Sequence, residues 1–235
     1  DGGGTKSEAL LVRSDGVVCG WGHCDVAEAG TMAAGARSRR VIRTVIRRAA
    51  AGLPAGARVT LDHAASHLDP ADMIPPELRS RIALKASMES LPLLSMVPER
   101  MGVVALAGTG SHVSGRNSAG QQAVCDGLGP NFGDFGGASR IGLQALRAAA
   151  FDHWHPRHQT SLAPRVIQAC RELDPGLKPF HLIGFFFRPR DRWQIASLAR
   201  LVDEEAERGD PIARQILEQA GQNLAELVFD VADTL

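Results

Sequence analysis

The chain has 235 residues, 44% of them hydrophobic and 22% charged, which is typical of a globular protein with a substantial buried core. Lysine plus arginine and aspartate plus glutamate number 26 each, so no net charge draws the chain to nucleic acid or to a membrane surface. Aromatic residues are few and tyrosine is absent, which argues against a stacking platform for bases.

Two features bear on the compartment. No run of 18 apolar residues occurs, so we expect no membrane-spanning segment. The cysteines are too few and too scattered for a disulfide scaffold, and we expect reduced thiols in a cytoplasmic protein: Cys19, Cys24, Cys125 and Cys170. The chain begins without a methionine, which leaves an upstream targeting segment open.

The first hundred residues alternate between strands and helices. Short apolar runs at 8–13 and 17–20 flank a turn signal and predict a hairpin, and helical spacing at 33–51 predicts a helix. The arginines along one side of this helix are better explained as a solvent-exposed face than as a surface that binds nucleic acid. Further on we expect strands at 58–61 and 82–86, a helical turn at 77–81 and a short helix at 87–96. This order indicates an α/β protein.

The pattern of strands and glycine turns then restarts. Strands are predicted at 102–107, 111–116 and 122–125. The order strand, glycine turn, strand, turn and strand thus occurs twice in the chain, which suggests a structural duplication. Helices are predicted at 139–151 and 162–173. The tail from 194 to 235 has a helical pattern with one break, where Asp210 caps and Pro211 occupies the first helical position.

Two glycine-rich turns that end in hydroxyl residues carry the chemical signal: Asp1-Gly2-Gly3-Gly4-Thr5-Lys6, and Gly108-Thr109-Gly110-Ser111 after an apolar strand. Glycine lets backbone N–H groups fold around an anion, and a hydroxyl adds one more donor. The first turn is no P-loop, because Thr5 precedes Lys6, and no dinucleotide fingerprint, because it leads into a hairpin. We therefore expect Thr5 and Thr109 to face one nucleotide phosphate cleft.

Two weaker patterns concern metals. Cys19, His23 and Cys24 could supply part of a zinc site. The sequence contains no second pair of ligands at the spacing found in zinc fingers, so the set is incomplete. The histidines of 153–158 have a ligand-like spacing, but Pro156 interrupts any helix that would align them, so a surface loop is favoured.

A third glycine cluster runs from Asp126 to Gly137. Taken in order, Asp-Gly-Gly-Gly-Thr-Lys, Gly-Val-Val-x-x-x-Gly-Thr-Gly-Ser and Gly-x-Gly-Pro-x-x-Gly-Asp-x-Gly resemble the BadF/BadG/BcrA/BcrD ATPase family, which includes N-acetylglucosamine kinase. The tail from 195 to 227 also resembles that family's late helices, so the resemblance covers essentially the whole chain.

The resemblance implies an actin-like (ASKHA) α/β fold with two ribonuclease-H-like domains around a nucleotide cleft, at 1–100 and 101–235. The second domain would be truncated, because the family's adenosine-binding strand is expected after Leu235. It further implies an ATP-dependent kinase acting on a small-molecule sugar or amino sugar, with Mg²⁺ and in a homodimer, but no nucleic-acid or membrane partner.

The resemblance also implies roles for individual residues. The metal would lie at Asp1, and Glu89 would be the catalytic base. The phosphate loops would be formed by Gly3, Gly4, Thr5 and Lys6, and by Gly108, Thr109 and Gly110. The sugar pocket would be lined by Ser111, His112, Gly127, Gly129 and Asp134.

Several positions depart from the family pattern. Glu89 replaces an aspartate, Phe135 replaces a glutamate, and His112 replaces an asparagine. These changes gather on the acceptor side, so ATP binding is the better supported half of the prediction. Two alternatives stay open: an ATPase that activates an electron-transfer enzyme, with an iron–sulfur cluster at Cys125 and Cys170, and a non-catalytic sensor of sugars or nucleotides.

Overall fold

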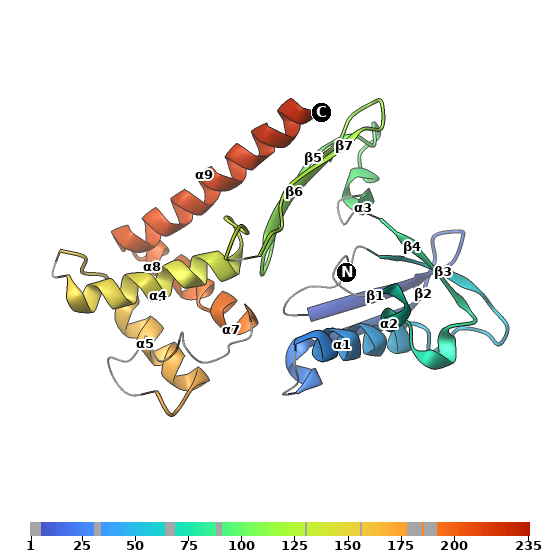
Figure 1. Cartoon of the computed structure of the whole chain (residues 1–235), viewed down its shortest axis with the longest axis horizontal. Coiled ribbons are helices and arrows are strands. Elements are labelled where there is room, and N and C mark those ends of the chain that lie inside the picture. Colours follow the sequence, from blue (N-terminus) through green and yellow to red (C-terminus); the bar gives the residue numbers. More distant parts are fainter. Residues whose placement is uncertain are drawn as a thin grey trace. The chain divides into compact units, whose positions relative to one another are not determined.

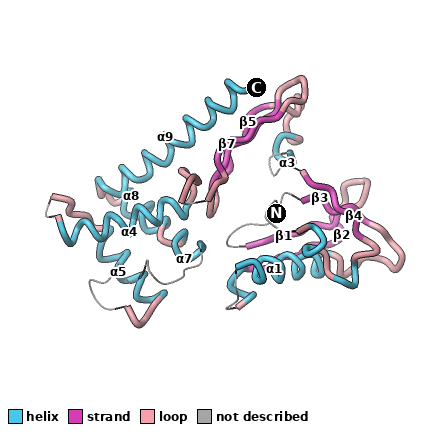
Figure 2. The backbone as a smooth tube through the Cα atoms, viewed as in Figure 1, coloured by secondary structure: helices cyan, strands magenta, loops and turns pink. Residues whose placement is uncertain are grey.

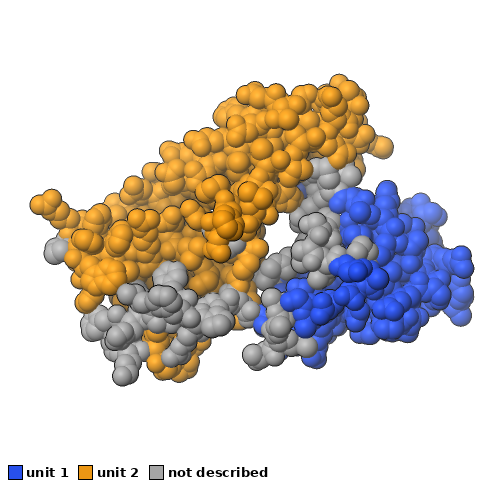
Figure 3. All heavy atoms as spheres, viewed as in Figure 1, with its two compact units in different colours: residues 1–93 blue, residues 94–235 orange. Residues whose placement is uncertain are grey.

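The computed structural model describes residues 6–30, 34–63, 69–87, 91–129, 131–155, 157–177, 185 and 192–235. The chain forms a mixed α/β fold with two compact units, Asp1–Leu93 and Leu94–Leu235, hereafter unit 1 and unit 2 (Figures 1 and 3). Within these described residues, no helix is both long enough and apolar enough to cross a bilayer.

Unit 1 is built on the predicted hairpin and the helix that covers it. Strands β1 (Lys6–Val12) and β2 (Val18–Asp25) pair antiparallel, and α1 (Ala34–Ala49) packs on them. Helix α1 approaches strand β2 closely because β2 has glycines where the two elements meet. A Cβ on Gly22 would lie 2.0 Å from the Val45 carbonyl oxygen. Val41 and Val45 of the helix are buried against this hairpin.

The rest of unit 1 contains a parallel pair of strands, β3 (Val59–His63) and β4 (Ile82–Ala86). Short helical turns η1 (Val26–Ala29), α2 (Pro70–Met73) and η2 (Pro76–Leu78) lie in its connections, and α3 (Leu91–Leu94) ends at the unit boundary. Among the described residues β3 pairs with β4 and not with the hairpin, so the predicted repeat of the three-strand pattern is not seen in unit 1.

Unit 2 begins with a three-stranded antiparallel meander in the order β5 (Gly102–Ala107), β6 (Ser111–Arg116) and β7 (Gln122–Asp126). Helix α9 (Pro211–Thr234) packs along this sheet, as Figure 1 shows. Gly115 in the central strand permits the contact, since a Cβ there would lie 3.0 Å from Val231 Cγ1.

The remaining helices of unit 2 lie together (Figure 2), and their side chains form its main core. Helix α4 (Ala138–Trp154) contacts α5 (Leu162–Leu173), α7 (Arg192–Ala196) and α8 (Ala199–Glu207). The side chains that fill this core are apolar and almost fully buried, among them Leu146, Leu162, Val166, Phe185 and Val202. The core orients α4, which starts at the glycine turns.

Most predicted elements are confirmed within one or two residues, including the strands at 82–86, 102–107 and 111–116 and the helix at 162–173. Three predictions need correction. The helical turn expected at 77–81 is a 3₁₀ turn at Pro76–Leu78, and of the helix expected at 87–96 the described part is helical only at Leu91–Leu94. The tail has a second break, at residues 197–198, between α7 and α8.

Candidate functional site

The glycine turn between β5 and β6 is fastened to the start of α4. The Gly108 N–H donates to the Gly110 carbonyl at 2.8 Å, which closes the turn. The Gly108 carbonyl accepts from Ala138 N at 2.8 Å, and the Thr109 carbonyl accepts from Ser139 N at 2.9 Å. Since the first amides of a helix have no partner inside it, the turn satisfies two of them. The helix therefore fixes the conformation of the turn.

Two glycines make this approach sterically possible. A Cβ on Gly137, the N-cap of α4, would lie 2.6 Å from the Gly110 carbonyl carbon. A Cβ on Gly110 would lie 2.6 Å from Asp134 Oδ2 and 2.7 Å from Arg192 Nη2. Only residues without a side chain fit at these two positions.

The turn keeps two unused donors. In the described part of the chain, the N–H groups of Thr109 and Gly110 donate to no other group, although those of Gly108 and Ser139 do. Successive free amides in a glycine turn form a cradle for an anion. The adjacent helix start adds the positive end of its dipole. This arrangement is suited to a phosphate group.

The loop after β7 holds Asp134 in place. The Asp126 carboxylate accepts from Asp134 N at 2.7 Å and from Phe135 N at 3.1 Å. Both aspartates have positive φ, 69° for Asp126 and 55° for Asp134, a conformation that costs energy outside glycine. The hydrogen bonds from the loop to Asp126 offset that cost. The result is a carboxylate held rigidly beside Gly110.

Asp134 forms an ion pair with Arg192, the first residue of α7. The Asp134 side chain is only 3% exposed, whereas that of Arg192 is 46% exposed. A buried carboxylate without a cation is strongly unfavourable, so the contact with Arg192 compensates for the burial of Asp134. Sequence reasoning missed Arg192, because it lies 58 residues away from Asp134 and in no recognised motif.

The remaining predicted pocket residues surround the same turn. The Ser111 hydroxyl accepts from Gly136 N at 3.2 Å, and its carbonyl accepts from Gly127 N at 3.1 Å. His112 is half-buried and pairs with Asp126 across β6 and β7. Gly127 and Gly129 have φ of 81° and 82°, which glycine adopts without strain. The structure thus brings together Gly108 to His112 with Gly127, Gly129 and Asp134.

The other predicted site residues belong to unit 1. Lys6 begins β1 in unit 1, is exposed, and has its Nζ 3.5 Å from Glu8 Oε1. The rest lie outside the described residues: Asp1, Gly3, Gly4, Thr5 and Glu89. The expected approach of Thr5 to Thr109 therefore stays a prediction.

The histidines and cysteines of the two weaker metal patterns have other contacts in the structure. His23 Nδ1 lies 3.1 Å from Glu8 Oε1, while the next residue, Cys24, is buried in the core of unit 1, since neighbours in a strand face opposite sides. His155 contacts the Phe151 ring edge-on, with centroids 5.3 Å apart. Within the described ranges, no three His, Cys, Asp or Glu side chains are grouped as metal ligands.

Two curated proteins are similar to this chain. One is the N-acetylmuramic acid/N-acetylglucosamine kinase of Clostridium acetobutylicum, 30% identical over 147 residues, which are 62% of this chain and 46% of that protein. The other is the N-acetyl-D-glucosamine kinase of Dictyostelium discoideum, 33% identical over 139 residues, 57% of this chain and 41% of that protein. The match thus spans less than half the length of either relative.

Solved structures share the fold. A crystal structure from Chromobacterium violaceum, of a protein provisionally named N-acetylglucosamine kinase, aligns with a TM-score of 0.67 and 22% identity over 96% of this chain and 79% of that one. A second crystal structure, from Porphyromonas gingivalis and with the same provisional name, aligns with a TM-score of 0.60 and 15% identity. The alignment covers 92% of this chain and 74% of that one. The family model of the BadF/BadG/BcrA/BcrD ATPases matches residues 1–235. With the glycine motifs and the fold in agreement, the chain belongs to the BadF/BadG/BcrA/BcrD ATPase family.

Proposed function

We propose that this chain is part of an ATP-dependent kinase that phosphorylates a sugar or amino sugar. Two free amides on a glycine turn, beside the start of a 17-residue helix, carry the proposal, because they form an anion cradle. Membership of an ATPase family makes an ATP phosphate the natural anion. The two curated relatives, both named as sugar kinases, support a sugar as the acceptor.

On the nucleotide side, Gly108, Thr109 and Gly110 would bind terminal phosphates through their backbone, with the Thr109 hydroxyl as a further donor. The loop of Gly3, Gly4, Thr5 and Lys6 would form the opposite wall. Mg²⁺ would lie at Asp1 and neutralise phosphate charge, an assignment that rests on the family resemblance. Asp134, the acid beside the turn, is already engaged by Arg192. Asp1 is therefore the better candidate for the metal.

On the acceptor side, Glu89 would accept the hydroxyl proton as general base. Ser111, His112, Gly127, Gly129 and Asp134 would contact the sugar. Asp134 is almost completely buried here, so its role in binding requires a sugar hydroxyl to reach the edge of its pair with Arg192. Among the described residues the Arg192 guanidinium donates only to Asp134, so its other donors would favour acceptors that carry an oxyanion or several hydroxyls.

The wider assignments are proposals of the same kind. We propose two ribonuclease-H-like domains around the nucleotide, with a boundary near residue 100, and a homodimer. The cytoplasm is proposed as the compartment from the four cysteines, all of them free thiols. The electron-transfer alternative gains no support from Cys170, which is fully buried in α5 and therefore not presented for a shared cluster.

The experiment is a coupled ADP-release assay on the full chain with a panel of sugars, amino sugars and acidic amino sugars. We expect sugar-dependent ADP formation. Glu89→Gln, nearly isosteric, should lower turnover by at least about 100-fold, the usual contribution of a general base, and leave ATP affinity unchanged. Glu99→Gln is the matched control, an exposed carboxylate ten residues along the chain. Ligand binding without ADP formation would instead identify a sensor.

A further inference from the structure

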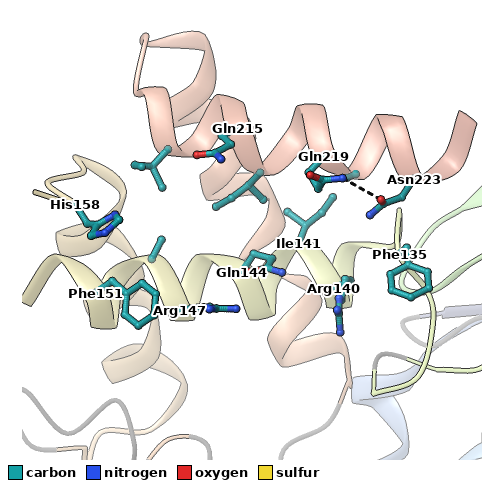
Figure 4. Close-up of a pocket in the computed structure, with 14 residues that line it drawn as sticks. Phe135, Arg140, Ile141, Gln144, Arg147, Phe151, His158, Gln215, Gln219 and Asn223 are labelled. Atoms are coloured by element: carbon teal, nitrogen blue, oxygen red, sulfur yellow. Dashed lines mark hydrogen bonds between the residues drawn. The ribbon is translucent and has the colours of Figure 1, made fainter. Parts of the chain in front are cut away.

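A groove separates α4 from α9 on the surface of unit 2 (Figure 4). Its volume is about 520 Å³, within the range of small-molecule sites. Its floor is apolar, with Ile141 of α4 between the two helices (Figure 4) and Ile216 of α9 also among the lining residues. The groove is thus a shaped feature between two packed helices and not a gap at a chain end.

Side-chain amides line both sides of this groove. Gln144 comes from α4, and Gln215, Gln219 and Asn223 come from α9. Gln219 Nε2 donates to Asn223 Oδ1 at 3.0 Å, which leaves the Gln219 carbonyl oxygen and the Asn223 amino group without a partner in the described part of the chain. Amides offer donors and acceptors together, the combination that sugar hydroxyls require.

The residues with a permanent charge that line the groove are all positive. Arg140 and Arg147 line it, and none of its lining residues is an aspartate or a glutamate. Arg147 is exposed, with its Cζ 5.1 Å from the centre of the Phe151 ring, and it has no carboxylate partner among the described residues. Because Arg140 and Arg147 are seven residues apart, they lie about 10 Å apart along the same side of α4. The groove therefore attracts anions.

We propose that the α4–α9 groove is a second ligand site, which binds a sugar phosphate. Arg147, with Arg140, would hold the phosphate by charge-assisted hydrogen bonds, and the amides of Gln144, Gln219 and Asn223 would bind the hydroxyls. An amphipathic peptide helix fits less well, since it needs a long apolar groove, and here amides interrupt the apolar floor. The proposal does not depend on the kinase reaction.

The test is titration calorimetry of the full chain with glucose 6-phosphate, in the absence of ATP, with glucose and inorganic phosphate as separate probes. Glucose 6-phosphate should bind more tightly than either probe. Arg147→Gln should weaken it about tenfold or more, because a charge-assisted hydrogen bond is lost. Gln219→Glu should weaken it similarly by placing a negative charge in the groove.

Matched controls lie outside the groove. Arg171→Gln removes an exposed arginine of α5, and Gln222→Glu adds a carboxylate on an exposed position of α9. Both controls should keep the affinity of the unaltered chain. The proposal is overturned if glucose 6-phosphate does not bind at millimolar concentration, or if Arg147→Gln and Gln219→Glu leave its affinity unchanged. Concentration-dependent dimerisation that Arg147→Gln abolishes would also overturn it, in favour of a second copy. A failed ADP-release assay leaves this result untouched.

Discussion

Thr160 and Asp210 join the start of α5 to the start of α9 by a buried hydrogen bond of 2.7 Å from Thr160 Oγ1 to Asp210 Oδ2. The other oxygen, Asp210 Oδ1, accepts from Ala213 N at 2.8 Å and caps α9. Ser161 N also donates to Oδ2, at 2.7 Å. One carboxylate thus satisfies the start of α9 and orients the helix that lines both the sheet of unit 2 and the groove.

Asp210→Ala is expected to destabilise the chain by about 2 kcal/mol, since it removes a helix cap and leaves the buried Thr160 hydroxyl without its acceptor. The free energy of unfolding in urea measures the effect. Asp203→Ala, on the exposed surface of α8, is the control and should cost less than about 0.5 kcal/mol. Equal losses in the two variants would contradict the role of Asp210.

Glu205 should make stability depend on pH. Hydrogen bonding from Ser161 and then Arg165 lowers the pKa of this buried carboxyl to about 2. Because the folded pKa lies below the ordinary value of 4.5, the stabilisation is complete above about pH 5 and is lost as the pH falls toward 2. Urea unfolding between pH 2 and 6 should show this slope. Glu205→Gln should flatten it, and Glu207→Gln, exposed on the same helix, should not.

Two helical glycines should respond oppositely to alanine. A Cβ on Gly142 of α4 would lie 2.0 Å from the Ile195 carbonyl oxygen of α7, so Gly142→Ala must push the helices apart and should cost about 2 kcal/mol or more. Gly221 of α9 has open space around it, and Gly221→Ala should stabilise the chain by about 0.5–1 kcal/mol through helix propensity. Thermal unfolding of both variants tests the pair. A stabilising Gly142→Ala would mean that α7 does not pack there.

Removing Arg192 should expose the cost of a buried, unpaired Asp134. Arg192→Gln is expected to destabilise the chain by about 2 kcal/mol, less than a fully buried pair would, because the guanidinium is half exposed. Adding Asp134→Asn should recover part of the loss, which a double-mutant cycle measures. Arg200→Gln, on a largely exposed i,i+4 pair with Glu204, is the control and should have little effect. Full additivity would show that the two side chains do not interact.

Local patterns predicted the elements well because each depended on neighbours in the chain. The apolar run of residues 102–107 and the helical spacing of 162–173 are properties of short segments, and so is the cap-and-proline start at Asp210. The three ordered glycine motifs likewise placed the chain in its family, since each motif is contiguous in sequence.

Only the tertiary structure revealed what surrounds the glycine turn. Its attachment to α4, the support of Asp134 by Asp126 and the ion pair with Arg192 join residues up to 58 positions apart, and no sequence period links them. The same holds for the groove, which exists because α4 and α9 pack together. Sequence determined which groups could bind an anion, whereas long-range packing decided which of them remain free to do so, since a donor used by a neighbouring helix is lost to a ligand.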